Sequence, residues 1–281
     1  MSTVAAAVAE AIDDEVLGER LWFYANYHCN LECNYCLTES GPAVARRLVD
    51  PDWMVERAHE ARDLGFRSLG VTGGEPFMVA SMPDTTARLA DVLPTVVLSN
   101  ATLLHGSRLD HVVGALAGRA VHIQVSLDAP DATENDAGRG DDNFREVTET
   151  VPRLIDRGLN IRIATTTVGL DADRLARLCA LHRSWGIPDD DHVVRPIVAR
   201  GRAAMADLGG VVAGRQDLAA ELCLTADGAF WSAFGPTVRN GRVDTDLLVT
   251  RQTAPVSVPA NAMVRIARGT PRGDDAGLGI R

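Results

Sequence analysis

The sequence predicts an α/β fold in which six βα units form a partial (β/α)6 TIM-like barrel. β-prone segments alternate with helical patterns from residue 20 to residue 199, which is typical of a parallel sheet with crossover helices. Six consecutive units favour a barrel, although a doubly wound open sheet has the same pattern. In both folds the chemistry gathers at the carboxyl ends of the strands.

The expected strands share a richness in β-branched and aromatic residues. They cover residues 20–28, 66–74, 95–102, 120–129, 159–169 and 192–199. The first expected helix begins at Asp50-Pro51, because proline is favoured at the first helical position, and it ends at Gly65. With the helices that follow, the set covers residues 50–65, 82–93, 105–118, 141–158 and 171–186.

Four segments are expected along the chain. Residues 1–19 lack a basic region and read as a leading helix rather than an export signal. Residues 20–205 form the barrel. Residues 206–252 form a β extension that covers the barrel, with a hairpin turn at Asp227-Gly228. Residues 253–281 contain several Pro and Gly and are expected to be a flexible tail.

Composition excludes several classes of function. The net charge is −10, from 38 acidic and 28 basic side chains, which disfavours nucleic acid, transfer RNA included, and an anionic membrane surface. No apolar run approaches the roughly 20 residues that cross a bilayer. Five cysteines are an odd number in a chain of 281 residues, so a disulfide scaffold is not expected. We expect the protein to be located in the reducing cytoplasm.

One expected strand separates apolar from polar side chains. Residues 121–128 alternate between the two types, and strand side chains alternate faces. The apolar set, which should pack under the helices, is Val121, Ile123, Val125 and Leu127. The polar set, which should line a lumen, is His122, Gln124, Ser126 and Asp128, joined from other strands by Trp22, Tyr24, Asn26, Arg162 and Thr166. The lumen is therefore expected to be polar and to receive a substrate.

Three thiols follow the first strand in the pattern C-x3-C-x2-C, at Cys29, Cys33 and Cys36. Such a loop binds either zinc or an iron–sulfur cluster. A zinc site would need a fourth ligand, and His28 is the neighbouring candidate, although its side chain leaves the backbone in a different direction from that of Cys29. Three thiolates with an open position favour a four-iron cluster whose fourth iron takes an exogenous ligand.

A second motif, VTGGEPF, ends the second strand at residues 71–77. Gly73 and Gly74 lack Cβ atoms, which lets backbone approach a ligand closely. Glu75 offers a carboxylate suited to an ammonium group. Taken alone, the same residues would read as a tight turn between strand and helix. Beside the three cysteines, a binding segment is favoured.

These two motifs resemble the radical S-adenosylmethionine (radical SAM) superfamily, over roughly residues 20–200. The resemblance implies a 4Fe–4S cluster bound by Cys29, Cys33 and Cys36, with SAM chelating the open iron. It further implies SAM contacts from several segments, including LSNAT, VSLDAP and GRGDDNF. The residues so assigned are Tyr35, Gly73, Gly74, Glu75, Pro76, Ser99, Asn100, Ser126 and Arg139. Arg195, on the last barrel strand, is expected near the adenosyl group.

The family's chemistry implies that SAM is cleaved reductively and that a deoxyadenosyl radical abstracts a hydrogen atom from the substrate. An external one-electron reductant of the flavodoxin or ferredoxin type is therefore expected. The SPASM and twitch branches carry further cysteines for auxiliary clusters, whereas only Cys179 and Cys223 follow Cys36 here. A redox-neutral outcome such as epimerisation is favoured for that reason.

The two remaining cysteines receive different interpretations. Cys179 follows the apolar spacing of its helix and is expected in the core. By resemblance to epimerases of the family, Cys223 is a candidate hydrogen-atom donor, and its alternative is a small buried apolar residue.

Three functions stay open. The first is an enzyme acting on a small metabolite or natural-product scaffold, sugars included. The second is a peptide-modifying enzyme, which the segments around Ser126 and Arg139 favour. The third is a non-catalytic zinc or iron–sulfur binding module.

Overall fold

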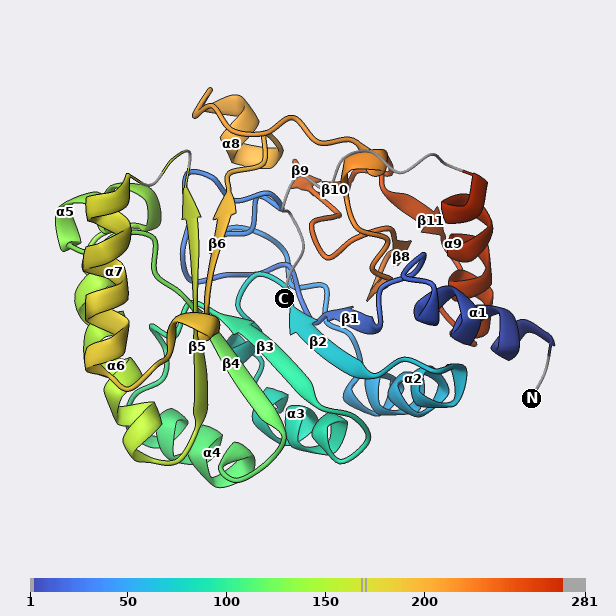
Figure 1. The fold of residues 1–281 in the computed structure, drawn as a ribbon, viewed down its shortest axis with the longest axis horizontal. Coiled ribbons are helices and arrows are strands. Elements are labelled where there is room, and N and C mark those ends of the chain that lie inside the picture. The colour runs from blue at the N-terminus through green and yellow to red at the C-terminus, as the bar shows by residue number, and fades with distance from the viewer. Residues whose placement is uncertain (1–2, 168, 170, 270–281) are drawn as a thin grey trace.

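The computed structural model describes residues 3–167, 169 and 171–269. Their main sheet has nine strands in the order β11-β8-β7-β1-β2-β3-β4-β5-β6. From β1 to β6 every neighbouring pair is parallel, and helices cover the outer face (Figure 1). The α/β class and the partial barrel are confirmed.

The barrel strands begin and end close to their expected bounds. They are β1 (Arg20–Tyr24), β2 (Ser68–Thr72), β3 (Thr95–Ser99), β4 (Val121–Ser126), β5 (Asn160–Thr167) and β6 (His192–Pro196). The helices between them are α2 (Pro51–Leu64), α3 (Met82–Ala90), α4 (Gly106–Leu116), α5 (Ala132–Arg139), α6 (Asn143–Asp156) and α7 (Ala172–Ser184). Short 3-10 turns η1 (Pro76–Met78) and η2 (Asp189–Asp191) precede α3 and β6.

Helix α2 shows how local sequence fixes an element. The Asp50 carboxylate accepts a hydrogen bond from the backbone N–H of Trp53, and Pro51 occupies the first turn. The helix ends at Gly65, whose φ of 100° is in the left-handed region. Helix α5 was not expected. It begins because Asp131 caps the N–H of Glu134 in the same way.

The extension after the barrel continues the main sheet past β1. It contains α8 (Gly201–Met205), η3 (Arg215–Asp217), β7 (Cys223–Thr225), β8 (Gly228–Phe230), β9 (Val238–Arg239), β10 (Arg242–Val243) and β11 (Leu248–Thr250). Strand β7 pairs in parallel with β1, with Trp22 opposite Cys223. Strands β7 and β8 form the antiparallel hairpin expected around Asp227, and β11 pairs with β8.

The expectation of a flexible tail over residues 253–281 is wrong for its first half. Helix α9 (Ser257–Gly269) buries Ala260, Met263 and Val264. The spacing of these residues forms an apolar face, which packs against α1 (Thr3–Asp13) and α2. Residues 270–281, and residues 1–2 of the expected leading helix, lie outside the described part.

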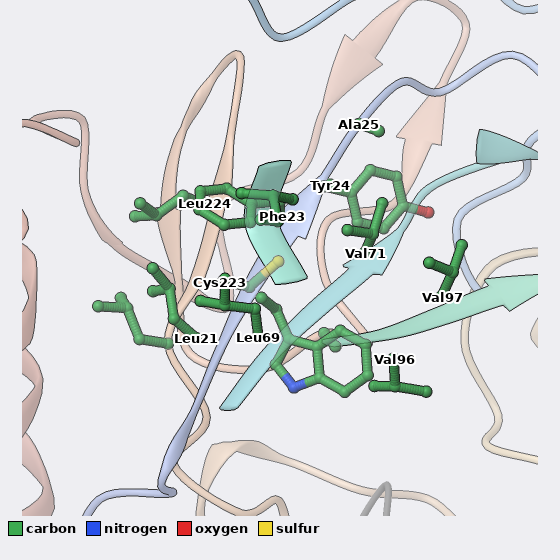
Figure 2. Close-up of a cluster of buried hydrophobic side chains, with 14 of the residues drawn as sticks. Leu21, Phe23, Tyr24, Ala25, Leu69, Val71, Val96, Val97, Cys223 and Leu224 are labelled. Carbon is green, nitrogen blue, oxygen red and sulfur yellow. The ribbon is translucent and has the colours of Figure 1, made fainter. Parts of the chain in front are cut away.

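The core forms where the apolar faces of β1, β2 and β3 meet the outer helices. Figure 2 shows Leu21, Phe23, Leu69 and Val71 clustered there, and each of them is fully buried. The alternation in residues 121–128 is confirmed on its apolar side, since all four of those residues are in the core. Among the described helices, none is long and apolar enough to cross a membrane.

Candidate active site

The three cysteines of the C-x3-C-x2-C motif lie on the long loop between β1 and α2. All three are free thiols. Cys29 is buried, whereas Cys33 and Cys36 are partly exposed and face a common cavity. The donor set is therefore three soft sulfurs gathered at the carboxyl end of β1, where parallel α/β folds place their ligands.

The Gly-Gly segment after β2 holds this loop through its backbone. The N–H of Gly74 donates to the carbonyl of Asn26 at 2.8 Å, and that of Glu75 donates to the carbonyl of His28 at 3.0 Å. A Cβ on Gly74 would lie 2.1 Å from the same His28 oxygen, and one on Gly73 would lie 2.5 Å from the Asn26 oxygen. Glycine is required because two backbones touch immediately before Cys29.

The carboxylate of Glu75 is enclosed rather than presented to the lumen. It is 1% exposed. One oxygen accepts from the N–H of Phe77 at 3.0 Å and from Oγ of Ser99 at 2.9 Å, and the other accepts from the N–H of Asn100 at 2.7 Å. Burial raises the pKa of Glu75, while these three donors oppose the shift. The carboxylate thus joins the ends of β2 and β3. Contact between this group and SAM stays a prediction.

Asn100 connects the same network to the cysteine loop. Its Nδ2 donates to Sγ of Cys29 at 3.7 Å and to Oδ1 of Asn30 at 3.0 Å. Its Oδ1 accepts from Thr102, from both the backbone N–H and the hydroxyl. The side chain is buried and its orientation is fixed by these partners. An amide donor therefore points at a cysteine sulfur.

Tyr35, Asp128 and Arg139 form a second buried network across the loop. The phenol donates to Oδ2 of Asp128, and Nη1 of Arg139 donates to the phenol and, at 3.2 Å, to the same carboxylate oxygen. The carbonyl of Arg139 also accepts from the Cys33 thiol at 3.9 Å. These contacts fix the cysteine loop to the end of β4 and to α5.

A third anchor comes from α8, which sequence reasoning missed. Arg202 donates from Nε to the carbonyl of Cys33 at 2.7 Å and from Nη2 to the carbonyl of Ser40. Its backbone N–H donates to the carbonyl of Cys36 at 3.1 Å. The sequence offers no local signal for this contact beyond an Arg-Gly-Arg stretch at residues 200–202.

His28 has its own partner. Its Nδ1 donates to the carbonyl of Val44 at 3.0 Å, and its backbone bridges to Gly41. This contact orients the ring towards the returning segment of the loop. The alternative in which His28 completes a zinc site receives no support from this arrangement.

A cavity of about 190 Å³ lies directly beside the thiols. Its walls come from the cysteine loop, the ends of β1 to β6, α5 and the extension. The predicted residues among its lining are Cys33, Tyr35, Cys36, Gly73, Ser126, Arg139, Tyr24, Thr166 and Arg195. Residues that were not predicted are Leu37, Thr38, Thr72, Leu98, Pro196, Val198, Ala233 and Phe234. Apart from Thr38 and Thr72, these residues are apolar, and none of them gave a signal in the sequence.

The structure leaves other predicted residues outside the cavity lining. Glu75, Ser99 and Asn100 lie behind the thiols in the network described above, and Pro76 begins η1. Cys223 is 0% exposed and belongs to the apolar cluster labelled in Figure 2. Burial raises the pKa of its thiol far above the usual range. A role for Cys223 as hydrogen-atom donor stays a prediction that this location does not support.

The thiols need a metal to become thiolates. Burial raises the pKa of Cys29 to about 12, with a further contribution from Glu75, and burial also raises the pKa of Cys33. At neutral pH both are therefore protonated and weakly nucleophilic. Coordination to a metal deprotonates such thiols outright, so the set suits coordination rather than nucleophilic catalysis.

Comparison with known proteins identifies the family. The model of the radical SAM superfamily matches residues 25–177, more than half of the chain. The GTP 3',8-cyclase of Chlorobaculum tepidum is 28% identical over 182 residues, which cover 59% of this chain and 53% of that protein. GTP 3',8-cyclase 2 of Mycobacterium bovis is 35% identical over 107 residues, 37% of this chain and 29% of that protein. The chain spans about half of these curated relatives, or less.

Solved structures share the fold. Streptococcus suis SuiB bound to its precursor peptide SuiA has a TM-score of 0.60 at 16% identity, covering 76% of this chain and 47% of that one. The structure of anSMEcpe with bound AdoMet has a TM-score of 0.53 at 13% identity, covering 77% and 74%.

The family match and the three-cysteine loop together indicate an iron–sulfur protein that binds a nucleotide cofactor. The chain belongs to the radical SAM superfamily. It is a radical SAM enzyme, and its cofactors are a 4Fe–4S cluster and SAM. The residues present fit the cluster, because three free cysteines lie on the loop that follows β1 and two of them face a cavity. Cys29, Cys33 and Cys36 would hold it.

Proposed function

We propose that this enzyme acts on a small anionic molecule and that the overall reaction is redox-neutral. When bound, the cluster supplies the electron that cleaves SAM to give the radical that abstracts hydrogen. The role of the protein itself is to hold the cofactors and the substrate and to exclude water.

The environment of Arg195 is the observation that supports an anionic substrate. This side chain is partly exposed, but its Nε is buried, and burial lowers the pKa of its guanidinium. Its Nε has no hydrogen-bond partner within the described part of the chain, yet the residue lines the cavity. A buried cation with an unused donor is costly unless a ligand satisfies it. A carboxylate or phosphate is the group that a guanidinium recognises best.

The curated relatives point in the same direction. The cavity itself, about 190 Å³, is lined by residues assigned to SAM, so its size does not separate one class of substrate from another. The curated relatives named above act, by their names, on GTP, which is itself an anionic small molecule. Their names support a metabolite over a protein substrate, and a nucleotide is the first class to test.

A redox-neutral outcome is supported by the thiol inventory. Outside the loop the chain has two cysteines, Cys179 and Cys223, which lie in α7 and β7. An auxiliary cluster would need more thiolates than these two. Epimerisation and ring closure are both redox-neutral. Peptide modification remains the alternative, favoured by the segments around Ser126 and Arg139.

The test is the formation of 5'-deoxyadenosine by anaerobically reconstituted protein with dithionite. Nucleotides, sugar phosphates, carboxylic acids and a pool of short peptides would each be added. We expect one anionic small molecule to accelerate the reaction, and we expect Arg195→Ala to raise KM for it more than Arg195→Lys does. Acceleration by peptides alone would overturn the proposal. Zinc-bound protein that leaves SAM intact would favour the non-catalytic module.

A further inference from the structure

A second cluster of potential metal ligands lies on the outer side of the barrel. Cys179 and His182 occupy successive turns of α7, and His192 is the first residue of β6. Their ligand atoms all lie within 4.8 Å of one another. None of the three lines the cavity described above, so radical chemistry gives them no role.

The hydrogen bonds of His192 fix which ring nitrogen carries its proton. The hydroxyl of Thr165 has one hydrogen, which it donates to the carbonyl of Leu127 at 2.6 Å. The same oxygen lies 2.9 Å from Nε2 of His192, and it must therefore accept a proton from that nitrogen. Nδ1 keeps its lone pair, and it faces Sγ of Cys179 at 3.9 Å.

The same argument applies to His182. Its Nδ1 lies 2.9 Å from the carbonyl oxygen of Ile187. A carbonyl can only accept, so Nδ1 carries the proton and Nε2 keeps its lone pair. The side chain is only 1% exposed, and that Nε2 is buried without a hydrogen-bond partner among the residues described. Oδ1 of Asp189 lies 3.9 Å from it, too far for a hydrogen bond. Both rings therefore direct an unprotonated nitrogen at the same point as the thiol.

Packing alone does not explain this arrangement. The two imidazole rings lie edge to face, with centroids 4.8 Å apart, and that contact is favourable in any case. It leaves the buried Nε2 of His182 without a hydrogen bond, which is unfavourable. The sequence predicted Cys179 in the core, and that prediction is wrong, because the residue is half-buried. Histidine ligands usually donate their other nitrogen to an oxygen acceptor. Here His182 donates to the carbonyl of Ile187 and His192 to the hydroxyl of Thr165.

We propose that Cys179, His182 and His192 bind a zinc ion, separate from the 4Fe–4S cluster. One sulfur and two imidazole nitrogens are a donor set that zinc accepts in tetrahedral geometry. Water takes the fourth position, because the nearby carboxylate of Asp189 already binds Arg183 through both oxygens. Binding releases the thiol proton to solvent. Ligand atoms around zinc are about 3.5 Å apart, so the side chains move inward by about 1 Å.

The role of the ion follows from its place in the fold. It would tie the last turn of α7 to the start of β6, two elements that the chain joins through η2. Strand β6 ends in Arg195 and Pro196, which line the cavity. The zinc would therefore stabilise the wall of the active site from outside. This inference does not depend on the proposed substrate.

The test separates zinc from iron by removing the cluster ligands. In full-length protein carrying Cys29→Ser, Cys33→Ser and Cys36→Ser, we expect about one zinc ion per chain by elemental analysis. Adding Cys179→Ser should remove it. The matched control, Cys223→Ser, removes the other remaining thiol and should retain the metal. Chelation should lower the Tm of the triple-serine protein. It should not change the Tm of the protein that also carries Cys179→Ser.

Cobalt gives a readout that needs only the triple-serine protein and does not depend on whether the Cys179→Ser variant folds. Cobalt(II) added to the triple-serine background should produce visible bands of a tetrahedral site and a thiolate charge-transfer band in the near ultraviolet. Equal zinc content with and without Cys179 would overturn the proposal. So would a folded triple-serine protein that binds neither zinc nor cobalt.

Discussion

The backbone N–H of Asn100 donates a 2.7 Å hydrogen bond to the carboxylate of Glu75, 25 residues earlier in the chain. Glu75 lies three residues after β2 and Asn100 directly follows β3, so one buried acid joins the ends of two neighbouring strands. The amide of the same Asn100 donates to Sγ of Cys29. Asn100 therefore couples the Gly-Gly-Glu motif to the cysteine motif, in addition to the backbone hydrogen bonds from Gly74 and Glu75.

Replacing the acid should weaken this junction. Glu75→Gln puts an NH2 group against one of the N–H donors that the carboxylate now satisfies. We expect a loss of about 1–3 kcal/mol in the free energy of unfolding, since a buried donor loses its acceptor. Ser99→Ala removes one donor to the acid and also the acceptor of the Ala101 N–H, so it measures the rest of the network and not the acid alone. Urea unfolding measures both variants, and a Glu75→Gln variant as stable as the parent protein would contradict the junction.

Gly201 tests how closely α8 packs under the cysteine loop. Its φ is 54°, and a Cβ there would lie 2.3 Å from the carbonyl oxygen of Leu37. Gly106 has almost the same φ, 53°, with open space around its Cβ position. Gly106→Ala should therefore cost about 1 kcal/mol from backbone strain alone, whereas Gly201→Ala should cost several times more and lower the iron content after reconstitution. Similar losses in the two variants would show that crowding at Gly201 is unimportant.

Tyr35 separates anchoring from cofactor binding. Tyr35→Phe keeps the ring that the family resemblance assigns to the adenine, and it removes the hydroxyl that bonds Asp128 and Arg139. We expect a loss of about 1–2 kcal/mol in the free energy of unfolding, the cost of a hydrogen bond to charged partners, with SAM affinity nearly unchanged. Tyr35→Leu should lose SAM affinity as well. Isothermal titration with reconstituted protein tests this, and equal SAM affinity in the two variants would remove the ring from the site.

Glu221 should make stability depend on pH. Its carboxyl accepts from Nε1 of Trp22 at 3.2 Å, and burial raises its pKa to about 7, opposed by Arg20. The folded state thus keeps the proton to higher pH than the unfolded state does. The contribution of this group is complete below the unfolded pKa of about 4.5 and is lost as the pH rises through about 7, by up to about 3 kcal/mol.

Glu221→Gln removes that dependence while its amide oxygen still accepts from Trp22. Unfolding by urea at several pH values between about 5.5 and 8 should give a shallower decline in stability for the variant than for the parent protein. Parallel pH profiles would mean that the pKa of Glu221 is not raised in the folded protein.

Cys223→Ala tests the proposed hydrogen-atom donor. Because the thiol lies in the core and does not line the cavity, we expect SAM cleavage and deuterium uptake from deuterated water to match the parent protein. The free energy of unfolding should fall by about 1 kcal/mol, since a small buried group is lost. Normal SAM cleavage with loss of deuterium uptake would restore Cys223 as the donor.

The sequence determined the features that depend on local patterns. The alternation of strands and helices predicted the barrel, the polar parity of residues 121–128 placed Ser126 at the lumen, and three closely spaced thiols predicted the cluster loop. Each signal is carried by residues within a few positions of one another. Strand and helix periodicity act over that range.

The tertiary structure decided which side chains meet across the barrel. Only the fold shows that the Glu75 carboxylate is satisfied by the end of β3, that Arg202 holds the cysteine loop, and that Cys179 faces His192. The apolar face of α9 was readable in the sequence, but its partner α1 lies at the other end of the chain. Contacts between distant residues depend on how whole elements pack, and one sequence carries no local pattern for them.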